Sequence, residues 1–205
     1  MAMLGSSYGG YPVPTSLLDD RSICYLAGTG EDISFDLALI ERFGCDVYAF
    51  DPVPRAAAYV AKAAAAEPRH HFMPVGLWSR DTTLSFHAPP QPGFVSHSAT
   101  NLKDTEAVFE APVRSVASVM QELGHGRLDL FKISAEGAEF EILDHILTAG
   151  IDARVLCVEF AQPASLERVL EYCRRLQAAG YQLVGAGQWR QWKLTFARPD
   201  PHPAI

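Results

Sequence analysis

Two glycines and a later acidic residue form the pattern in this chain that is best suited to chemistry. The run over residues 23–26 leads into Gly28 and Gly30, and a second run over residues 46–50 ends at Asp51. Both runs are mainly apolar and have the length of short buried strands. Glycine lets the backbone approach a ligand closely, and a carboxylate about twenty residues later can accept hydrogen bonds from both hydroxyls of a ribose. The spacing therefore predicts a site for a nucleoside cofactor.

The charges beside these glycines indicate which cofactor. Ile33 stands where a dinucleotide-binding pattern would have its third glycine. Glu31 and Asp32 open the helix expected over residues 33–43, at the position where a pyrophosphate would bind, although Asp32 also suits a helix cap. Two carboxylates repel phosphate and suit a cation, and S-adenosylmethionine carries a sulfonium and an ammonium group but no phosphate. We therefore expect this methyl donor, with a nicotinamide dinucleotide in an oxidoreductase as an alternative.

The elements that must position these residues alternate along the chain, which predicts one α/β domain built on a parallel sheet. With 205 residues, 48% of them hydrophobic, the chain can bury one substantial core. We expect an irregular arm over residues 1–20, a single domain over 21–198 and a tail over 199–205. Further strands are predicted at 71–75, 128–133, 155–160, 181–184 and 192–197, and further helices at 56–66, 115–123, 138–148 and 165–179. The last two strands have no helix between them, so they pair as a hairpin rather than as parallel neighbours.

Composition and charge argue against several classes of protein. A net charge of −7 without a cluster of lysine or arginine argues against a nucleic-acid partner and favours a small molecule or saccharide as substrate. No apolar run reaches the length of a membrane span, and no basic-then-apolar signal opens the chain. The four cysteines are scattered, and the seven histidines lack zinc-ligand spacing. We therefore expect a cytoplasmic protein with reduced thiols, no metal and no membrane contact, while the oligomeric state stays open.

The candidate cofactor site lies at the carboxyl ends of the predicted strands, where open parallel sheets bind their ligands. Asp51 follows the second strand directly and is placed to hold a ribose. Leu77 or Trp78, after the third strand, could lie against an adenine ring. The residues expected to contact the cofactor are Gly28, Thr29, Gly30, Glu31, Asp51, Pro52, Gly76, Leu77, Trp78 and Ser134.

A second group of polar residues surrounds the end of the strand predicted at 128–133. Lys132 interrupts this buried strand, so it needs a partner or a wet edge. Glu136 precedes a glycine and can project over the rim of the sheet, whereas Glu139 is expected to be a solvated or N-terminal helix charge. Glu159, near the end of the next buried strand, needs a hydrogen-bond or charge partner and is a further candidate to line the pocket.

Three stretches, residues 28–36, 49–52 and 131–139, resemble the FkbM family of S-adenosylmethionine-dependent methyltransferases. Residues 9–14 are similar to the segment before the first strand in that family, and the similarity runs in order through most of the chain. It implies a Rossmann-like methyltransferase fold, an α/β fold with a seven-stranded, mostly parallel sheet. The implied strand order is 3-2-1-4-5-7-6, with strand 7 antiparallel and helices on both faces. The resemblance also implies methyl transfer from S-adenosylmethionine, usually to a hydroxyl group.

Two departures from the family pattern bear on catalysis. Leu26 stands where many methyltransferases have an acid. Ser134 and Ala135 replace the Asp and Ile of the family's Lys-Ile-Asp-Ile-Glu-Gly pattern. If that Asp helps to hold substrate or methionine groups, a module that binds the cofactor with little turnover is an alternative to an active enzyme.

Methyl transfer to a hydroxyl requires alignment of the acceptor and benefits from a base within hydrogen-bond reach. Glu136, Glu159 and His97 are the candidates for this base, in that order. His97 lies in the irregular stretch over residues 88–101, which is long enough to suggest a functional loop. We expect this loop and the N-terminal arm to close over the pocket.

Overall fold

A seven-stranded sheet forms the centre of the molecule. The computed structural model describes residues 1–91, 93–187 and 192–198. The strands of the main sheet are β3 (Ile23–Ala27), β4 (Asp46–Phe50), β5 (His70–Met73), β9 (Leu128–Ile133), β10 (Ala153–Phe160), β11 (Gln182–Ala186) and β12 (Trp192–Ala197). They lie in the order β11-β12-β10-β9-β3-β4-β5, which is the predicted order 3-2-1-4-5-7-6 read from the other edge. β12 runs antiparallel to both of its neighbours, while the pairs from β10 through β9, β3 and β4 to β5 are parallel. The predicted fold is confirmed.

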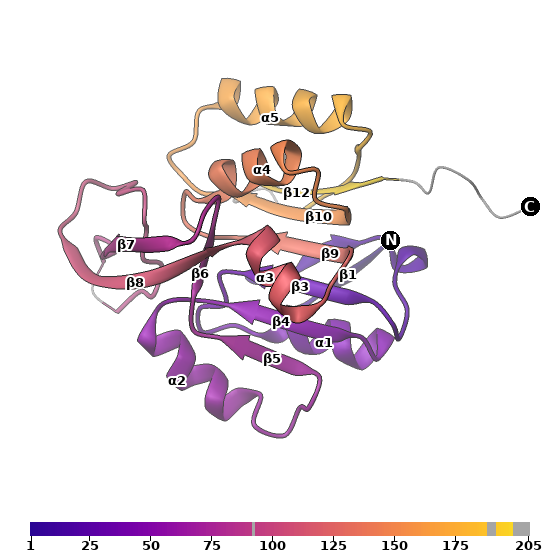
Figure 1. Cartoon of the computed structure of the whole chain (residues 1–205), viewed down its shortest axis with the longest axis horizontal. Helices are drawn as coiled ribbons and strands as arrows, with labels where there is room; N and C mark the ends of the chain where they lie inside the picture. Colours follow the sequence, from indigo (N-terminus) through magenta and orange to yellow (C-terminus); the bar gives the residue numbers. More distant parts are fainter. Residues whose placement is uncertain (92, 188–191, 199–205) are drawn as a thin grey trace, which may run out of the picture.

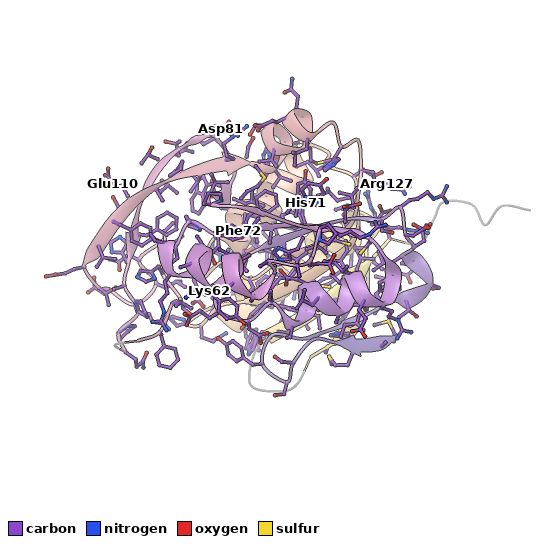
Figure 2. The ribbon with its side chains drawn as sticks, turned by 90° about the horizontal axis from the view of Figure 1, so that it is seen from below. Lys62, His71, Phe72, Asp81, Glu110 and Arg127 are labelled. Carbon is purple, nitrogen blue, oxygen red and sulfur yellow. The ribbon has the colours of Figure 1, made fainter. Side chains whose placement is uncertain are left out.

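Helices cover both faces of this sheet. They are α1 (Ser34–Phe43), α2 (Pro54–Ala63), α3 (Val116–Leu123), α4 (Glu139–Thr148) and α5 (Leu166–Ala178). α3, α4 and α5 pack into one core cluster, and α1 packs into a second cluster on the opposite face. In Figure 1, α3 and α4 lie in front of the strands; Figure 2, seen from below, brings α2 with its Lys62 to the front.

The central strand β9 divides its side chains between the two faces. All six of its residues are buried. Phe131 and Ile133 pack with α3, α4 and α5, whereas Leu130 packs with α1. By the alternation of a strand, Lys132 shares the face of Leu130 and lies near the carboxyl end of the sheet. The register of this strand thus decides on which side of the sheet the lysine emerges.

A smaller, three-stranded sheet stands beside the carboxyl ends of the main strands. It consists of β6 (Gly76–Trp78), β7 (Thr82–His87) and β8 (Ala107–Ser115), with β8 in the middle. β7 pairs with β8 in antiparallel fashion and β6 pairs with it in parallel. In Figure 1 the arrows of β4 and β5 point towards this small sheet, which therefore borders the edge where a ligand is expected.

The N-terminal arm is more ordered than the sequence predicts. Within the arm predicted to be irregular, residues 1–20, β1 (Ala2–Leu4) and β2 (Tyr11–Val13) form an antiparallel hairpin, and Thr15–Leu17 is a turn of 3-10 helix. All three residues of β2 are buried. Strands of three residues show no periodicity in a sequence, and the Gly, Ser and Pro around them indicate only turns. The arm therefore belongs to the folded unit, while the predicted tail, 199–205, lies outside the described residues.

Three further observations concern membrane-spanning helices, metal ligands and the cysteines. Among the residues that the structure describes, no helix is long and apolar enough to cross a membrane. The same residues contain no cluster of three or more His, Cys, Asp or Glu side chains that could hold a metal ion. All four cysteines are free thiols, and three of them are buried.

A hydrogen bond between the first and last parts of the fold can be tested directly. The fully buried Thr195 hydroxyl donates to the Pro12 carbonyl at 2.8 Å. Thr195→Val keeps the shape but leaves that carbonyl unpaired, so we expect the free energy of unfolding to fall by about 1–3 kcal/mol. Urea unfolding measures the change, with the exposed Thr83→Val as the matched control. Equal stability of both variants would mean that the arm docks without this bond.

Candidate active site

A cavity of about 500 Å³ opens at the carboxyl ends of the main strands. The loop after β3, the turn after β9, the ends of β4 and β10, the N-terminal arm and the loop around residues 93–99 all contribute to its walls. Every residue predicted to bind the cofactor or to act as a base lines this cavity. The structure thus brings together all of these candidates from distant parts of the sequence, while their individual roles remain predictions.

Asp51 holds the glycine loop in place. Its Oδ2 accepts hydrogen bonds from the Thr29 and Gly30 N–H groups at 2.9 and 2.8 Å, and its Oδ1 accepts one from Val53 N–H at 2.8 Å. Burial raises the pKa of Asp51, while these backbone donors favour the ionised form. Among the described residues only the Val53 N–H donates to Oδ1, so a ribose contact there would add to this structural role.

Gly28 is required by the protein's own backbone. Its φ is +79°, and a Cβ at this position would lie 1.7 Å from the carbonyl oxygen of Ser134. The Gly28 N–H donates to the Phe50 carbonyl at 2.9 Å. Sequence reasoning attributed this glycine to the approach of a ligand, but the close contact is between the loops that follow β3 and β9.

The two acidic residues at the start of α1 differ in their pairing. Glu31 forms an ion pair with Arg55, with Oε2 and Nη2 2.6 Å apart. Asp32 accepts hydrogen bonds from the Ser34 N–H at 2.9 Å and the Ser6 hydroxyl at 2.6 Å. Burial opposes the ionisation of Asp32, but these bonds lower its pKa on balance. Of the two carboxylates expected to face the ligand without a cationic partner, only that of Asp32 does so in the described part of the chain, because Arg55 compensates Glu31. The sequence does not show that Arg55 lies opposite Glu31.

One end of the cavity is apolar. A Cβ at Gly76 would lie 2.9 Å from Val113, 3.5 Å from Pro52 and 3.6 Å from Phe86, so these side chains surround the glycine closely. Leu77 is buried in the core cluster next to them. This end suits a flat, weakly polar ring of the kind predicted for the contact with Leu77 or Trp78.

The opposite end is charged and includes residues that sequence reasoning missed. The Oε2 of Glu159 accepts hydrogen bonds from the Ser134 hydroxyl at 2.9 Å and the Tyr11 hydroxyl at 3.2 Å. Lys193 lies 3.7 Å from the same oxygen. Lys132 finds its partner in the Gly28 carbonyl, to which its ammonium group donates. Lys193 could have been noticed as a polar residue at an alternating position of the last strand. No comparable pattern in the sequence indicates that Tyr11 belongs to the site.

Glu136 lies in a strained turn that meets the loop around residues 93–99. Its φ is +47°, in the left-handed region that few non-glycine residues adopt. The Ser98 hydroxyl donates to its carbonyl at 2.7 Å. Burial raises the pKa of the Glu136 carboxyl, and a hydrogen bond from Ser96 opposes this shift. His97 in the same loop contacts Phe109 edge-on, with ring centres 5.3 Å apart, so its ring is also held by packing.

Glu139 was expected to be a solvated or N-terminal helix charge; it does begin α4, but the expectation of a solvated side chain was wrong. The side chain is fully buried and folds back onto the preceding turn. Its carboxylate oxygens accept hydrogen bonds from the Ala135 N–H at 2.9 Å and the Gly137 N–H at 2.8 Å. Burial raises the pKa of Glu139 to about 8. Glu139 therefore fixes the turn that carries Ser134 and Glu136.

Comparison with known proteins agrees with this architecture. A family model described as the methyltransferase FkbM domain matches residues 27–183. No curated protein matches the sequence.

Solved structures with the same fold are distant in sequence. An rRNA methylase from Streptococcus thermophilus has a TM-score of 0.52 and 14% identity, over 90% of each chain. A putative methyltransferase from Streptococcus mutans, solved in complex with SAH, has a TM-score of 0.53 and 10% identity, over 92% of this chain and 99% of that one. A precorrin-6y C5,15-methyltransferase from Geobacter metallireducens has a TM-score of 0.51 and 10% identity, over 89% and 82% of the two chains. At these identities the similarity establishes the fold.

The raised pKa of Glu139 predicts a specific pH dependence of stability. The folded protein keeps a proton that the unfolded chain releases between the usual value of 4.5 and about 8. The free energy of unfolding should therefore fall as the pH rises through this window, by about 1.4 kcal/mol per pH unit for this one group. Urea unfolding at several pH values should show that Glu139→Gln removes this component of the slope and that the exposed Glu167→Gln keeps it. A slope unaffected by Glu139→Gln would show that Glu139 stays ionised in the fold.

Proposed function

This chain belongs to the FkbM methyltransferase family, and we propose that it transfers a methyl group from S-adenosylmethionine to a hydroxyl group on a small molecule or saccharide. The observation that carries the proposal is the division of a single cavity into an apolar end, a glycine loop and a charged end that contains Glu159. S-adenosylmethionine is an adenosine joined to a charged amino acid, so its adenine, ribose and ionic parts follow one another in the same order as these parts of the cavity.

The residues of the cavity fit this cofactor. The apolar end around Leu77 would hold the adenine, and Asp51 with the glycine loop would hold the ribose. The Thr29 hydroxyl oxygen is buried on the cavity wall and has no partner among the described residues, as expected of a group reserved for a ligand. Lys132 and Asp32 supply charges of opposite sign for the carboxylate and the ammonium group of the methionine part. When bound, S-adenosylmethionine supplies a methyl group on a positively charged sulfur, which needs no further activation.

Glu159 is the base that the geometry favours for an acceptor hydroxyl. The described donors gather on its Oε2, which leaves Oε1 able to accept the hydroxyl of an acceptor and to take its proton. Glu136, ranked first from the sequence, is engaged with the loop through Ser96. His97 is held by its contact with Phe109. We therefore assign the base to Glu159 and an electrostatic role towards the cofactor to Glu136.

The mouth of the cavity suits an uncharged or weakly charged acceptor. Tyr8 from the arm and Phe94 from the loop line the cavity with 62% and 59% of their surfaces exposed. Aromatic faces of this kind pack against the rings of small molecules or saccharides. The net charge of −7 and the carboxylates of the site disfavour a polyanion such as RNA, although one protein of similar fold is an rRNA methylase.

Two measurements test the proposed function. Calorimetry should show binding of S-adenosylmethionine and S-adenosylhomocysteine, and no comparable binding of NAD. Mass spectrometry with a deuterated methyl donor should then detect labelled ether products in mixtures of hydroxyl acceptors. Binding without product from any acceptor would favour the alternative, a cofactor-binding module of low activity. Labelled amines would overturn the choice of a hydroxyl group, and labelled RNA would overturn the choice of a small molecule or saccharide.

Loss of the Asp51 carboxylate should weaken cofactor binding. Asp51→Ala removes the acceptor for the Thr29 and Gly30 N–H groups, so we expect the binding free energy of S-adenosylmethionine to weaken by about 1–3 kcal/mol. Calorimetry measures the change, and the exposed Asp20→Ala serves as the control. A dissociation constant that stays at the wild-type value would remove Asp51 from the cofactor site.

Neutralising Glu159 should slow the reaction while leaving cofactor binding largely intact. A general base contributes roughly 10²–10⁴-fold to a rate, so we expect Glu159→Gln to lower kcat by a factor in this range. The comparison variants are Glu136→Gln in the same cavity and Glu167→Gln on the exposed face of α5. Full activity of Glu159→Gln on a verified acceptor would rule out Glu159 as the base. A larger loss of activity in Glu136→Gln would identify Glu136 as the base, in agreement with its first place among the candidates from the sequence.

A further inference from the structure

Lys193 occupies an unusual position for a lysine. It lies on β12 directly opposite Glu159 on β10 in the antiparallel register, lines the cavity and is only 5% exposed. Lysine is seldom buried unless it is paired. A Cβ at Gly187 would lie 2.9 Å from the Lys193 Cβ, so the glycine of the hairpin leaves room for this side chain. The local structure is thus built around the lysine.

The ammonium group of Lys193 joins the arm to the site. It donates a hydrogen bond to the Tyr8 carbonyl and lies 4.8 Å from the centre of the Tyr11 ring. Its Nζ is 3.7 Å from the Oε2 of Glu159. Burial lowers the pKa of Lys193, and the carboxylate of Glu159 opposes this shift. The ion pair and the aromatic face therefore help to keep a buried ammonium group charged.

The described contacts of the Glu159 carboxylate with neighbouring donors all involve one of its two oxygens. The Tyr11 hydroxyl, the Ser134 hydroxyl and Lys193 all approach Oε2. In the described part of the chain, no group donates to Oε1, and the Glu159 side chain keeps 20% of its surface exposed. A carboxylate arranged in this way has a fixed orientation and one free acceptor oxygen.

Titratable groups from several elements surround Glu159. Tyr8 and Tyr11 face it from the arm, and Glu136 faces it from the turn after β9. Lys193 faces it from β12 as the cation within ion-pair distance. Lys132 and Asp32 lie further along the cavity and act on Lys193 itself.

We propose that Lys193 is a positioning residue for Glu159: its ammonium group approaches Oε2 and turns the carboxylate so that the free Oε1 meets the acceptor. The catalytic consequence rests on the proposed function, whereas the side-chain orientation of Glu159 is a property of the protein alone. A lysine with a merely structural role would pin the arm through Tyr8 without affecting this orientation.

The orientation of Glu159 can be measured without any substrate. Crystal structures of the variants show the Glu159 conformer and whether Oε2 keeps its contacts with the Tyr11 and Ser134 hydroxyls. We expect Lys193→Met and Lys193→Gln to release the carboxylate into other side-chain conformers, since the cation beside Oε2 has been removed. Lys193→Gln keeps donors for the Tyr8 carbonyl, so it separates the charge from the pinning of the arm.

The matched controls are Lys193→Arg, which keeps the charge, and Lys62→Met, which removes an exposed lysine on α2. Both should keep the wild-type conformer of Glu159. Once an acceptor is identified, Lys193→Met and Lys193→Gln should lower kcat by roughly tenfold or more while the KM for the methyl donor stays unchanged, and Lys193→Arg should recover the rate.

Two results would overturn the proposal: a wild-type conformer of Glu159 in both neutral variants, or a kcat that stays at the wild-type value in both. Failure of the proposed function would look different. It would appear as an absence of methyl transfer by the wild-type protein while the conformer of Glu159 still responds to Lys193.

Discussion

The approach of two backbones, at Gly28 and Ser134, sets the geometry on which the rest of the site depends. A Cβ at Gly28 would lie 1.7 Å from the Ser134 carbonyl, so only glycine allows the loops after β3 and β9 to meet. The Ser134 N–H then donates to the Ala27 carbonyl at 3.0 Å. Through this contact the glycine loop on one side and the turn with Glu136 on the other become parts of one hydrogen-bonded frame. Asp51 and Glu139 complete this frame by accepting the N–H groups of the two loops.

The charges of the cavity are satisfied to different degrees, and this difference defines what can bind. Arg55 compensates the carboxylate of Glu31 with an ion pair at 2.6 Å. Asp36, which also lines the cavity, is paired with His70 at 2.9 Å in a nearly fully buried contact. Lys132, by contrast, has no carboxylate within ion-pair distance in the described part of the chain, since its contact is with a backbone carbonyl. The carboxylates of Glu31 and Asp36 thus have partners within the protein, whereas the ammonium group of Lys132 has no compensating carboxylate among the described residues.

The sequence was informative where local pattern and chemistry agree. The glycine loop, the strand over residues 128–133 and the closing hairpin follow from apolar periodicity and turn residues, and the resemblance to a family added the strand order. The hairpin in the arm was not predicted, because strands of three residues show no periodicity in the sequence. Tyr11 and Lys193 were not predicted as site residues for another reason. Their place in the site comes from contacts with Glu159, which is 148 residues away from Tyr11 in the sequence. Glu139 was misjudged because a helix-start carboxylate turned inward looks the same in sequence as one turned outward.

Part of the cavity wall comes from two segments outside the main sheet, namely the N-terminal arm and the loop around residues 93–99. The frame that would bind the donor is buried in the sheet and its connections, whereas Tyr8 and Phe94 stand at the rim with most of their surface free. The same segments also reach the site below, since Tyr11 donates to Glu159 and the Ser98 hydroxyl donates to the Glu136 carbonyl. Under the proposed function, evolution or protein engineering can vary the acceptor by exchanging the exposed rim side chains while these inner contacts are kept, much as antibodies vary loops on a constant scaffold.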